Sequence, residues 1–201
     1  KSKEFFDEKL SQEIESTVLT PNLNGNPDEG EIKSIIQDIN PENIKEFCND
    51  YSLSQNALFL SAIALTLNKF TFSDKTLITS IFNGRSNPYY YDTQGFLVKT
   101  LPLIFNNENR QETIKEFING IDNVWKDTIN HSEYPYTNIA NDYQLKPEFF
   151  FSYQEFYKSE EIRINDKVYE EYELSSDVIS ETTYKINFDI FVYEDNIQFK
   201  L

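Results

Sequence analysis

Few residues of this 201-residue chain have the types and spacing that catalytic chemistry needs. His131 is the sole histidine and Cys48 the sole cysteine, so a histidine-rich metal site and an internal disulfide framework are both excluded. The sequence shows no phosphate-binding glycine loop and no zinc-ligand spacing. We therefore predict no metal site and no catalytic residue within the chain.

The two candidate nucleophile or base residues have plainer interpretations. His131 follows a predicted long helix, where an imidazolium would favour the negative end of the helix dipole, so a capping or structural role is favoured. Cys48 lies among apolar residues of a predicted helix and is predicted to be a core residue; a Cys–His pair would need the distant His131. Carboxylate pairs at 160–161 and 170–171 lie in charged stretches and are predicted to be solvated.

Three short segments stand out because of their order. The first is Asn83-Gly84-Arg85, after a predicted strand. The second is 95–103 (Gly-Phe-Leu-Val-Lys-Thr-Leu-Pro-Leu), and the third is 131–136 (His-Ser-Glu-Tyr-Pro-Tyr), after the predicted long helix. Together they resemble the C-terminal half of non-ribosomal peptide synthetase condensation domains. Members of that family show a strand ending in Gly-Arg, then Gly-x-Phe-Val-Asn-Thr-Leu-Pro, then His-x-x-x-Pro-Phe.

The resemblance implies an α/β fold, a chloramphenicol-acetyltransferase-like lobe with a mixed β-sheet covered by helices. Two such lobes would form a V, with the active site in a tunnel between them. Residues 1–201 would be the C-terminal lobe, entered through a helix and linker over 1–30. Because the chain begins at Lys1 and contains no Met, and because its last predicted strand stops mid-element, we expect it to be truncated at both ends. The catalytic His-His-x-x-x-Asp-Gly segment belongs to the other half, so the isolated lobe is expected to be inactive.

The first segment carries the best candidate site residue by this resemblance. In the family the arginine of Gly-Arg commonly pairs with the aspartate of the histidine motif, so Arg85, with Gly84 and Asn83, is implied to support the active site. A planar guanidinium suits that role because it can hold a carboxylate through two hydrogen bonds. The alternative is an exposed arginine that ends a strand.

The second segment is implied to line the tunnel or bridge the lobes through Gly95, Phe96, Lys99, Thr100 and Pro102. Lys99 departs from the family pattern, where most members have Asn. A flexible cation there could reach a phosphate or a carboxylate, or point to solvent.

The third segment implies structural roles for His131, Pro135 and Tyr136. Tyr136 replaces the usual Phe, which keeps the ring and adds a hydroxyl that needs a partner. The Arg-Asp-x-Ser-Arg-Asn-Pro segment of many bacterial members is not recognisable between Asp142 and Phe149, which indicates a divergent branch.

By the same resemblance, the parent domain would transfer a thioester-bound acyl or peptidyl group to the amine of a carrier-bound amino acid. Its partners would be the N-terminal lobe and the donor and acceptor carrier proteins. No cofactor would bind directly, because 4'-phosphopantetheine tethers the substrates. Alternatives are an epimerisation or cyclisation relative, another acyltransferase, a non-catalytic module that holds carrier proteins, or an α/β domain with coincidental motifs.

Periodicity and capping signals predict the elements that position these segments. Helices are expected over 1–15, 41–50, 57–70 (after an N-cap at Ser54), 110–130 and 134–143. Strands are expected over 31–39, 77–82, 96–105 (interrupted by Pro102), 149–156, 168–174, 184–193 and 197–201. The first strand range also fits a helix. A linker is predicted over 21–30, and a Tyr-rich loop over 83–95.

Composition limits the function classes. The net charge of −16 would repel a phosphate backbone, so we predict no nucleic-acid partner. The spread acidity indicates a solvated surface, with an acidic docking face as the alternative. No apolar run approaches the roughly 20 residues of a membrane span, and a lone cysteine suits a reducing interior. We therefore expect a cytoplasmic protein with no membrane partner.

Overall fold

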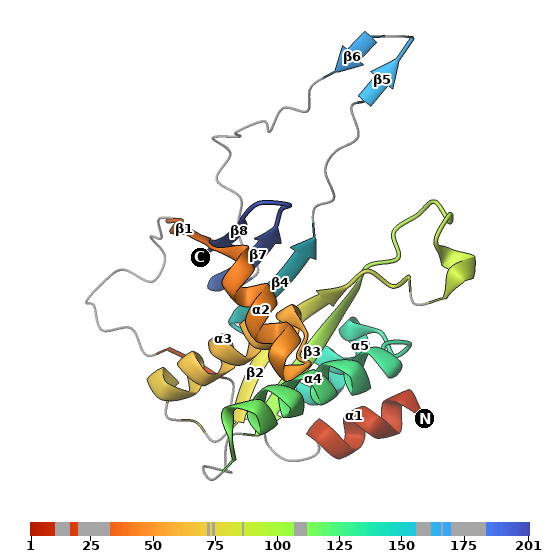
Figure 1. The fold of residues 1–201 in the computed structure, drawn as a ribbon. Helices are drawn as coiled ribbons and strands as arrows, with labels where there is room; N and C mark the ends of the chain where they lie inside the picture. Colours follow the sequence, from red (N-terminus) through yellow and green to blue (C-terminus); the bar gives the residue numbers. More distant parts are fainter. Residues whose placement is uncertain are drawn as a thin grey trace.

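The computed structural model describes residues 1–10, 17–19, 33–71, 73, 75–85, 87–106, 112–155, 162–165, 167–169 and 184–201. Six strands form a mixed sheet in the order β1-β8-β7-β4-β2-β3 (Figure 1). The pairs β2–β4 and β4–β7 are parallel, and the outer pairs are antiparallel. The strands are β1 Ile36–Ile39, β2 Lys75–Phe82, β3 Lys99–Asn106, β4 Phe149–Glu155, β7 Ile186–Val192 and β8 Ile197–Lys200. The strands β5 Ile162–Ile164 and β6 Lys167–Tyr169 form a two-stranded sheet of their own.

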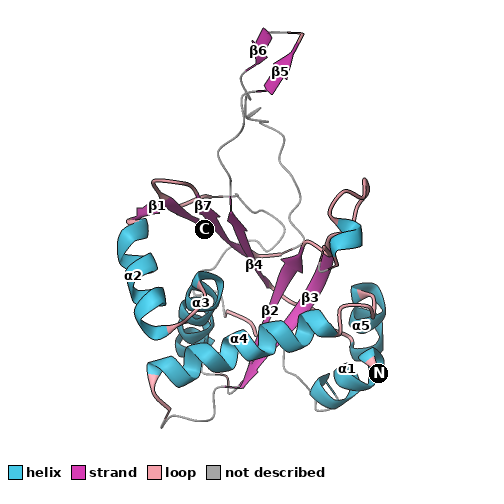
Figure 2. Cartoon of the chain, turned by 45° about the vertical axis from the view of Figure 1, so that its right-hand side comes forward, coloured by secondary structure: helices cyan, strands magenta, loops and turns pink. Residues whose placement is uncertain are grey.

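Helices cover both faces of the six-stranded sheet (Figure 2). They are α1 Ser2–Leu10, α2 Pro41–Tyr51, α3 Gln55–Thr71, α4 Ile114–Asn130 and α5 Tyr136–Tyr143, with a short 3₁₀ turn, η1, at Pro88–Tyr90. On strand β3, Leu103 and Phe105 join the core under α3 and α4, whereas Ile104 joins the cluster of α1 and α5. Since successive strand residues point to opposite faces, α1 and α5 lie on the opposite face from α3. The expected fold class is confirmed.

Helix α3 is the most buried helix, as its nearly continuous apolar sequence predicts. Leu60 and Ala64 have no exposed surface, and they pack in one cluster with Phe149 and Phe151 of β4 and Leu103 of β3. This cluster lies between α3, α4 and one face of the sheet, so it holds together the strands and the helix that lead into the three sequence segments.

Capping residues set the helix starts. The Asn40 side chain accepts from the Glu42 N–H, with Pro41 at the first helical position, and Ser54 Oγ accepts from the Ala57 N–H. Both predicted caps are confirmed. The predicted helix over 110–130 instead begins at Ile114, because Thr113 and Glu116 form a reciprocal capping box there. Residues 107–111 lie outside the described residues.

Several strand boundaries differ from expectation. The ambiguous 31–39 stretch is a strand over Ile36–Ile39. The 96–105 strand begins only at Lys99, because residues 96–98 belong to the loop that closes against Gly84. Pro102 does not interrupt β3, because β3 is an edge strand and an edge tolerates a missing N–H. The predicted linker 21–30, and the part of the predicted 168–174 strand after Tyr169, lie outside the described residues. Strand β5 was not predicted. Among the described residues, no helix combines the length and apolar character that crossing a bilayer requires.

Candidate functional site

The three segments meet at one end of the β2–β3 pair. Phe82, the last residue of β2, pairs with Lys99, the first of β3, so the first and second segments are adjacent in space. The turn between α4 and α5 carries the third segment, and Lys99 reaches its Glu133. We call this group of residues 83–85, 95–103 and 131–136 the motif cluster.

The backbone of Gly84 lies in close contact with the backbone of Leu97 in the motif cluster. Its φ is +71°, and a Cβ built on it would lie 1.9 Å from the Leu97 carbonyl oxygen. A side chain at this position would therefore meet both a left-handed backbone and a fixed backbone atom. The glycine that the family pattern places before the arginine has a clear steric reason here.

The Arg85 side chain donates hydrogen bonds to carbonyl oxygens of the loop between β2 and β3. Its Nη1 donates to the Thr93 carbonyl oxygen at 2.9 Å and also to the Tyr90 carbonyl oxygen, and its backbone N–H donates to Asn83 Oδ1 at 2.9 Å. Arg85 is half-buried, so it is not simply a solvent-exposed strand end. No carboxylate of the described residues forms an ion pair with it, and the implied pairing with an aspartate of the other lobe stays a prediction.

The loop that Arg85 holds displays aromatic side chains to solvent. Tyr89 is 88% exposed and Phe96 is 90% exposed, with Tyr91 between them also largely exposed. The loop is internally fastened, because Asn87 Oδ1 accepts from the Tyr89 N–H and Thr93 Oγ1 donates to the Tyr89 carbonyl. Exposed aromatic side chains on a fastened loop are typical of a contact surface.

Lys99 forms an ion pair within the motif cluster. Its ammonium lies 2.5 Å from Glu133 Oε1 and 3.5 Å from Ser132 Oγ. Of the destinations that the sequence left open for this cation, the structure shows a carboxylate. Because Lys99 is on β3 and Glu133 follows α4, this ion pair ties the second segment to the third.

We expect a charge exchange to reveal this coupling. Lys99→Glu should lower the free energy of unfolding by about 0.5–1 kcal/mol, since it faces Glu133 with a like charge and the Glu133 side chain is 82% exposed. The double variant Lys99→Glu with Glu133→Lys should recover most of that loss. Urea denaturation of the chain, the two single variants and the double variant measures the coupling. Additive effects would show that the two side chains act independently.

His131 lies at the end of α4, as its place in the sequence predicted. It is the C-cap of α4, where its N–H donates to the Thr128 carbonyl at 3.1 Å. Its ring stacks on Phe5 of α1, with ring centroids 4.2 Å apart. The imidazole is therefore held between two helices.

Tyr136 is half-buried, and its hydroxyl lies close to two other hydroxyl groups. It lies beside Thr79 of β2 and Tyr184, which comes just before β7. Burial raises the pKa of both tyrosines, so the hydroxyls stay protonated near neutral pH. Tyr184 also stacks on Phe150, with centroids 5.0 Å apart. Pro135, the residue before Tyr136, is the N-cap of α5.

The reactive side chains in and near the motif cluster take part in the packing of the fold. Its only imidazole caps a helix, and within the described residues no group of His, Cys, Asp and Glu could hold a metal ion. Cys48 is buried as predicted, and burial raises the pKa of its thiol, which keeps it a poor nucleophile. Ser152 Oγ donates to Asp189 Oδ1 across β4 and β7, without a histidine to activate it.

Sequence reasoning missed every long-range partner of these residues. Glu133 for Lys99, Tyr184 for Tyr136, and Phe5 for His131 are separated from them by dozens of residues. The one usable signal was the expectation that a buried phenol needs a hydrogen-bond partner. It indicated that a partner exists and gave no indication of which one.

Comparisons with a family model and with solved structures show which proteins this chain resembles. A family model described as "Condensation domain" matches residues 1–201. The chain is similar to VibH, a non-ribosomal peptide synthetase condensation enzyme, at 16% identity and a TM-score of 0.70, covering 99% of this chain and 47% of that chain. It is similar to the first condensation domain of the calcium-dependent antibiotic synthetase at 10% identity and a TM-score of 0.69, covering 99% and 45%.

A third similar structure is the EpoB cyclization-docking bidomain from Sorangium cellulosum, at 9% identity and a TM-score of 0.71, covering 99% of this chain and 42% of that chain. A comparison with curated protein sequences found no match. The chain spans less than half the length of all three of these structures. At these identities the structural likeness establishes the fold, and it confirms the chloramphenicol-acetyltransferase-like fold expected from the sequence.

Proposed function

The chain belongs to the condensation-domain family, and from this premise we propose that it is the C-terminal lobe of a domain that joins a carrier-bound acyl donor to a carrier-bound amine. The substrates of that domain would be thioesters on 4'-phosphopantetheine arms, and its partners the N-terminal lobe and two carrier proteins. The free, buried thiol of Cys48 also supports a cytoplasmic location.

The observation that carries this proposal is the convergence of the three segments into one motif cluster. Arg85, Lys99 and Tyr136 each come from a different segment, and each is fixed by partners within the lobe. The one imidazole of the cluster, that of His131, caps α4, which suits a lobe that supports an active site completed by another half. We infer that the aromatic loop with Tyr89 and Phe96 contacts that other half.

The direct test joins this chain to its native upstream sequence and supplies donor and acceptor carrier proteins loaded with aminoacyl-pantetheine. We expect the joined protein to form a peptide bond, read by mass spectrometry of the released product, and the isolated chain to form none. Carrier binding without product would favour the non-catalytic module. Inversion of the donor stereocentre would identify an epimerisation domain, and a heterocyclic product a cyclisation domain.

Substitution of Arg85 gives a more specific prediction for the same assay. Arg85→Ala should lower the rate of product formation by at least about tenfold, because the loop loses both carbonyl contacts and the expected carboxylate partner. Arg85→Lys keeps the charge without the planar fork and should fall between. The thermal unfolding midpoint of each variant serves as the folding control. An unchanged rate for Arg85→Ala in a folded protein would remove Arg85 from the active-site support.

A further inference from the structure

Strand β1 forms the edge of the sheet opposite to β3. Ile35 and Leu201 exchange two backbone hydrogen bonds of 2.8 Å, and the pairing of β1 with β8 continues from there. Because hydrogen-bonded residues alternate along an antiparallel strand, the N–H and C=O groups of Ile36 and Asp38 point away from β8. Within the part of the chain that the structure describes, no strand pairs with this outer edge.

The outer edge of β1 begins with exposed apolar side chains. Ile35 is 62% exposed and Ile36 is 56% exposed, although protected edges usually present charges, prolines or bulges. The Gln37 side chain donates its amide N–H to the Asp38 carbonyl at 3.0 Å. That carbonyl oxygen therefore already accepts a hydrogen bond from an amide N–H. The main chain of an added strand would offer the same kind of donor.

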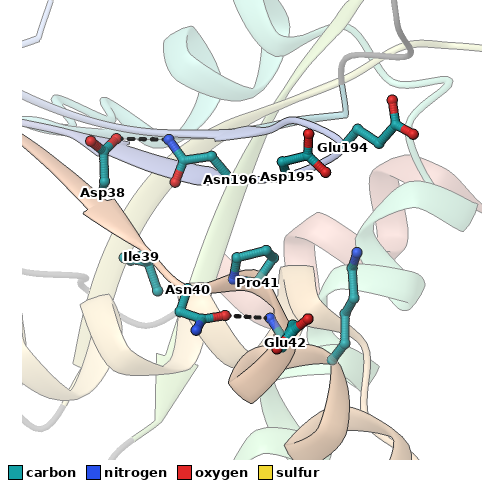
Figure 3. Close-up of a pocket in the computed structure, with 9 residues that line it drawn as sticks. Asp38, Ile39, Asn40, Pro41, Glu42, Glu194, Asp195 and Asn196 are labelled. Atoms are coloured by element: carbon teal, nitrogen blue, oxygen red, sulfur yellow. Dashed lines mark hydrogen bonds between the residues drawn. The ribbon is translucent and has the colours of Figure 1, made fainter.

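An acidic hollow of about 540 Å³ adjoins the end of β1 (Figure 3). It lies between β1, the start of α2 and the turn that joins β7 to β8. Among the described residues that line it, Asp38, Glu42 and Asp195 contribute carboxylates, and Lys45 contributes an ammonium. Asn196 Nδ2 donates to Asp38 Oδ1 at 2.8 Å, which orients one of these carboxylates. The hollow is complementary in charge to lysine or arginine side chains.

We propose that the outer edge of β1 accepts an extended, basic segment of another protein as an added strand. The main chain of that segment would bond the groups of Ile36 and Asp38, an apolar side chain would cover Ile36, and a basic side chain would enter the acidic hollow. The proposal goes beyond the condensation reaction, because β1 and the motif cluster lie at opposite edges of the sheet.

The test uses the chain itself and a short, end-blocked peptide of alternating valine and lysine carrying a fluorophore. We expect saturable binding by fluorescence anisotropy, weakening as salt is added, because screening acts on the hollow. A matched peptide of alternating valine and glutamate should not bind. In NMR spectra of the labelled chain, the shifted amide signals should be those of 35–39 and the hollow. Equal binding of both peptides, or shifts located elsewhere, would overturn the proposal.

Two variants separate the edge from the charge. Ile36→Pro removes an outward N–H and leaves the bonds toward β8 in place, so binding should weaken at least about tenfold while the unfolding midpoint changes little. Glu42→Gln combined with Asp195→Asn should weaken binding and flatten its salt dependence. Unchanged affinity in both variants, or a second copy of the chain on this edge in sedimentation experiments, would refute the proposal. Peptide binding is measured on the isolated chain, so its outcome is independent of the condensation assay.

Discussion

Gly84→Ala is expected to lower the free energy of unfolding by roughly 2–4 kcal/mol. The added Cβ would fall 1.9 Å from the Leu97 carbonyl oxygen, and the residue would also have to keep a φ of +71°. Since the clashing atom belongs to the backbone, the loop must open for the methyl group to fit. That opening would separate the first segment of the motif cluster from the second. Urea denaturation followed by circular dichroism measures the change.

Gly120→Ala is the matched control. Gly120 lies on an exposed face of α4, and nothing lies within 4 Å of a Cβ built there. Alanine has the higher helix propensity, so this variant should raise the free energy of unfolding by about 0.5–1 kcal/mol. The same methyl group should thus have opposite effects at the two positions. A Gly84→Ala protein as stable as the starting chain would show that the loop yields without cost.

Phe151→Ala is expected to cost about 3–5 kcal/mol, because it empties a fully packed site in the centre of the sheet. Phe151 is 1% exposed and belongs to the main core cluster with Leu60 and Ile78. The flanking backbone is fixed on both sides, since β4 pairs with β2 and β7, so little collapse into the cavity is possible. A fall in the urea midpoint with an unchanged slope would show a loss of stability without a change in the unfolded state.

Phe150→Ala is the control for that variant. Phe150 neighbours Phe151 but points to the other face of the sheet, where it is half-buried and stacks on Tyr184. Its removal should cost less than half as much. Comparable losses for the two variants would indicate that the second face is packed as tightly as the first.

The sequence alone predicted most elements and the three segments of the site. The capped starts of α2 and α3, the long amphipathic helix α4 and the strand character of β2, β4, β7 and β8 all depend on residues within a turn or two of one another. The position of His131 at the end of α4 and the burial of Cys48 were predictable for the same reason. Predictions were wrong where the outcome depends on the order of the strands in the sheet. Pro102 seemed to interrupt a strand, yet the sheet order makes that strand an edge.

The tertiary structure decided which residues the motif cluster brings together. Lys99 could have faced solvent, a phosphate or a carboxylate, and only the placement of the α4–α5 turn beside β3 selects Glu133. Arg85 bonds two loop carbonyls because Gly84 lets that loop close on Leu97. Residue types and short-range spacing determine which groups are available and how each local segment folds. Strand order and register determine which groups meet, because such contacts join residues that no local periodicity relates.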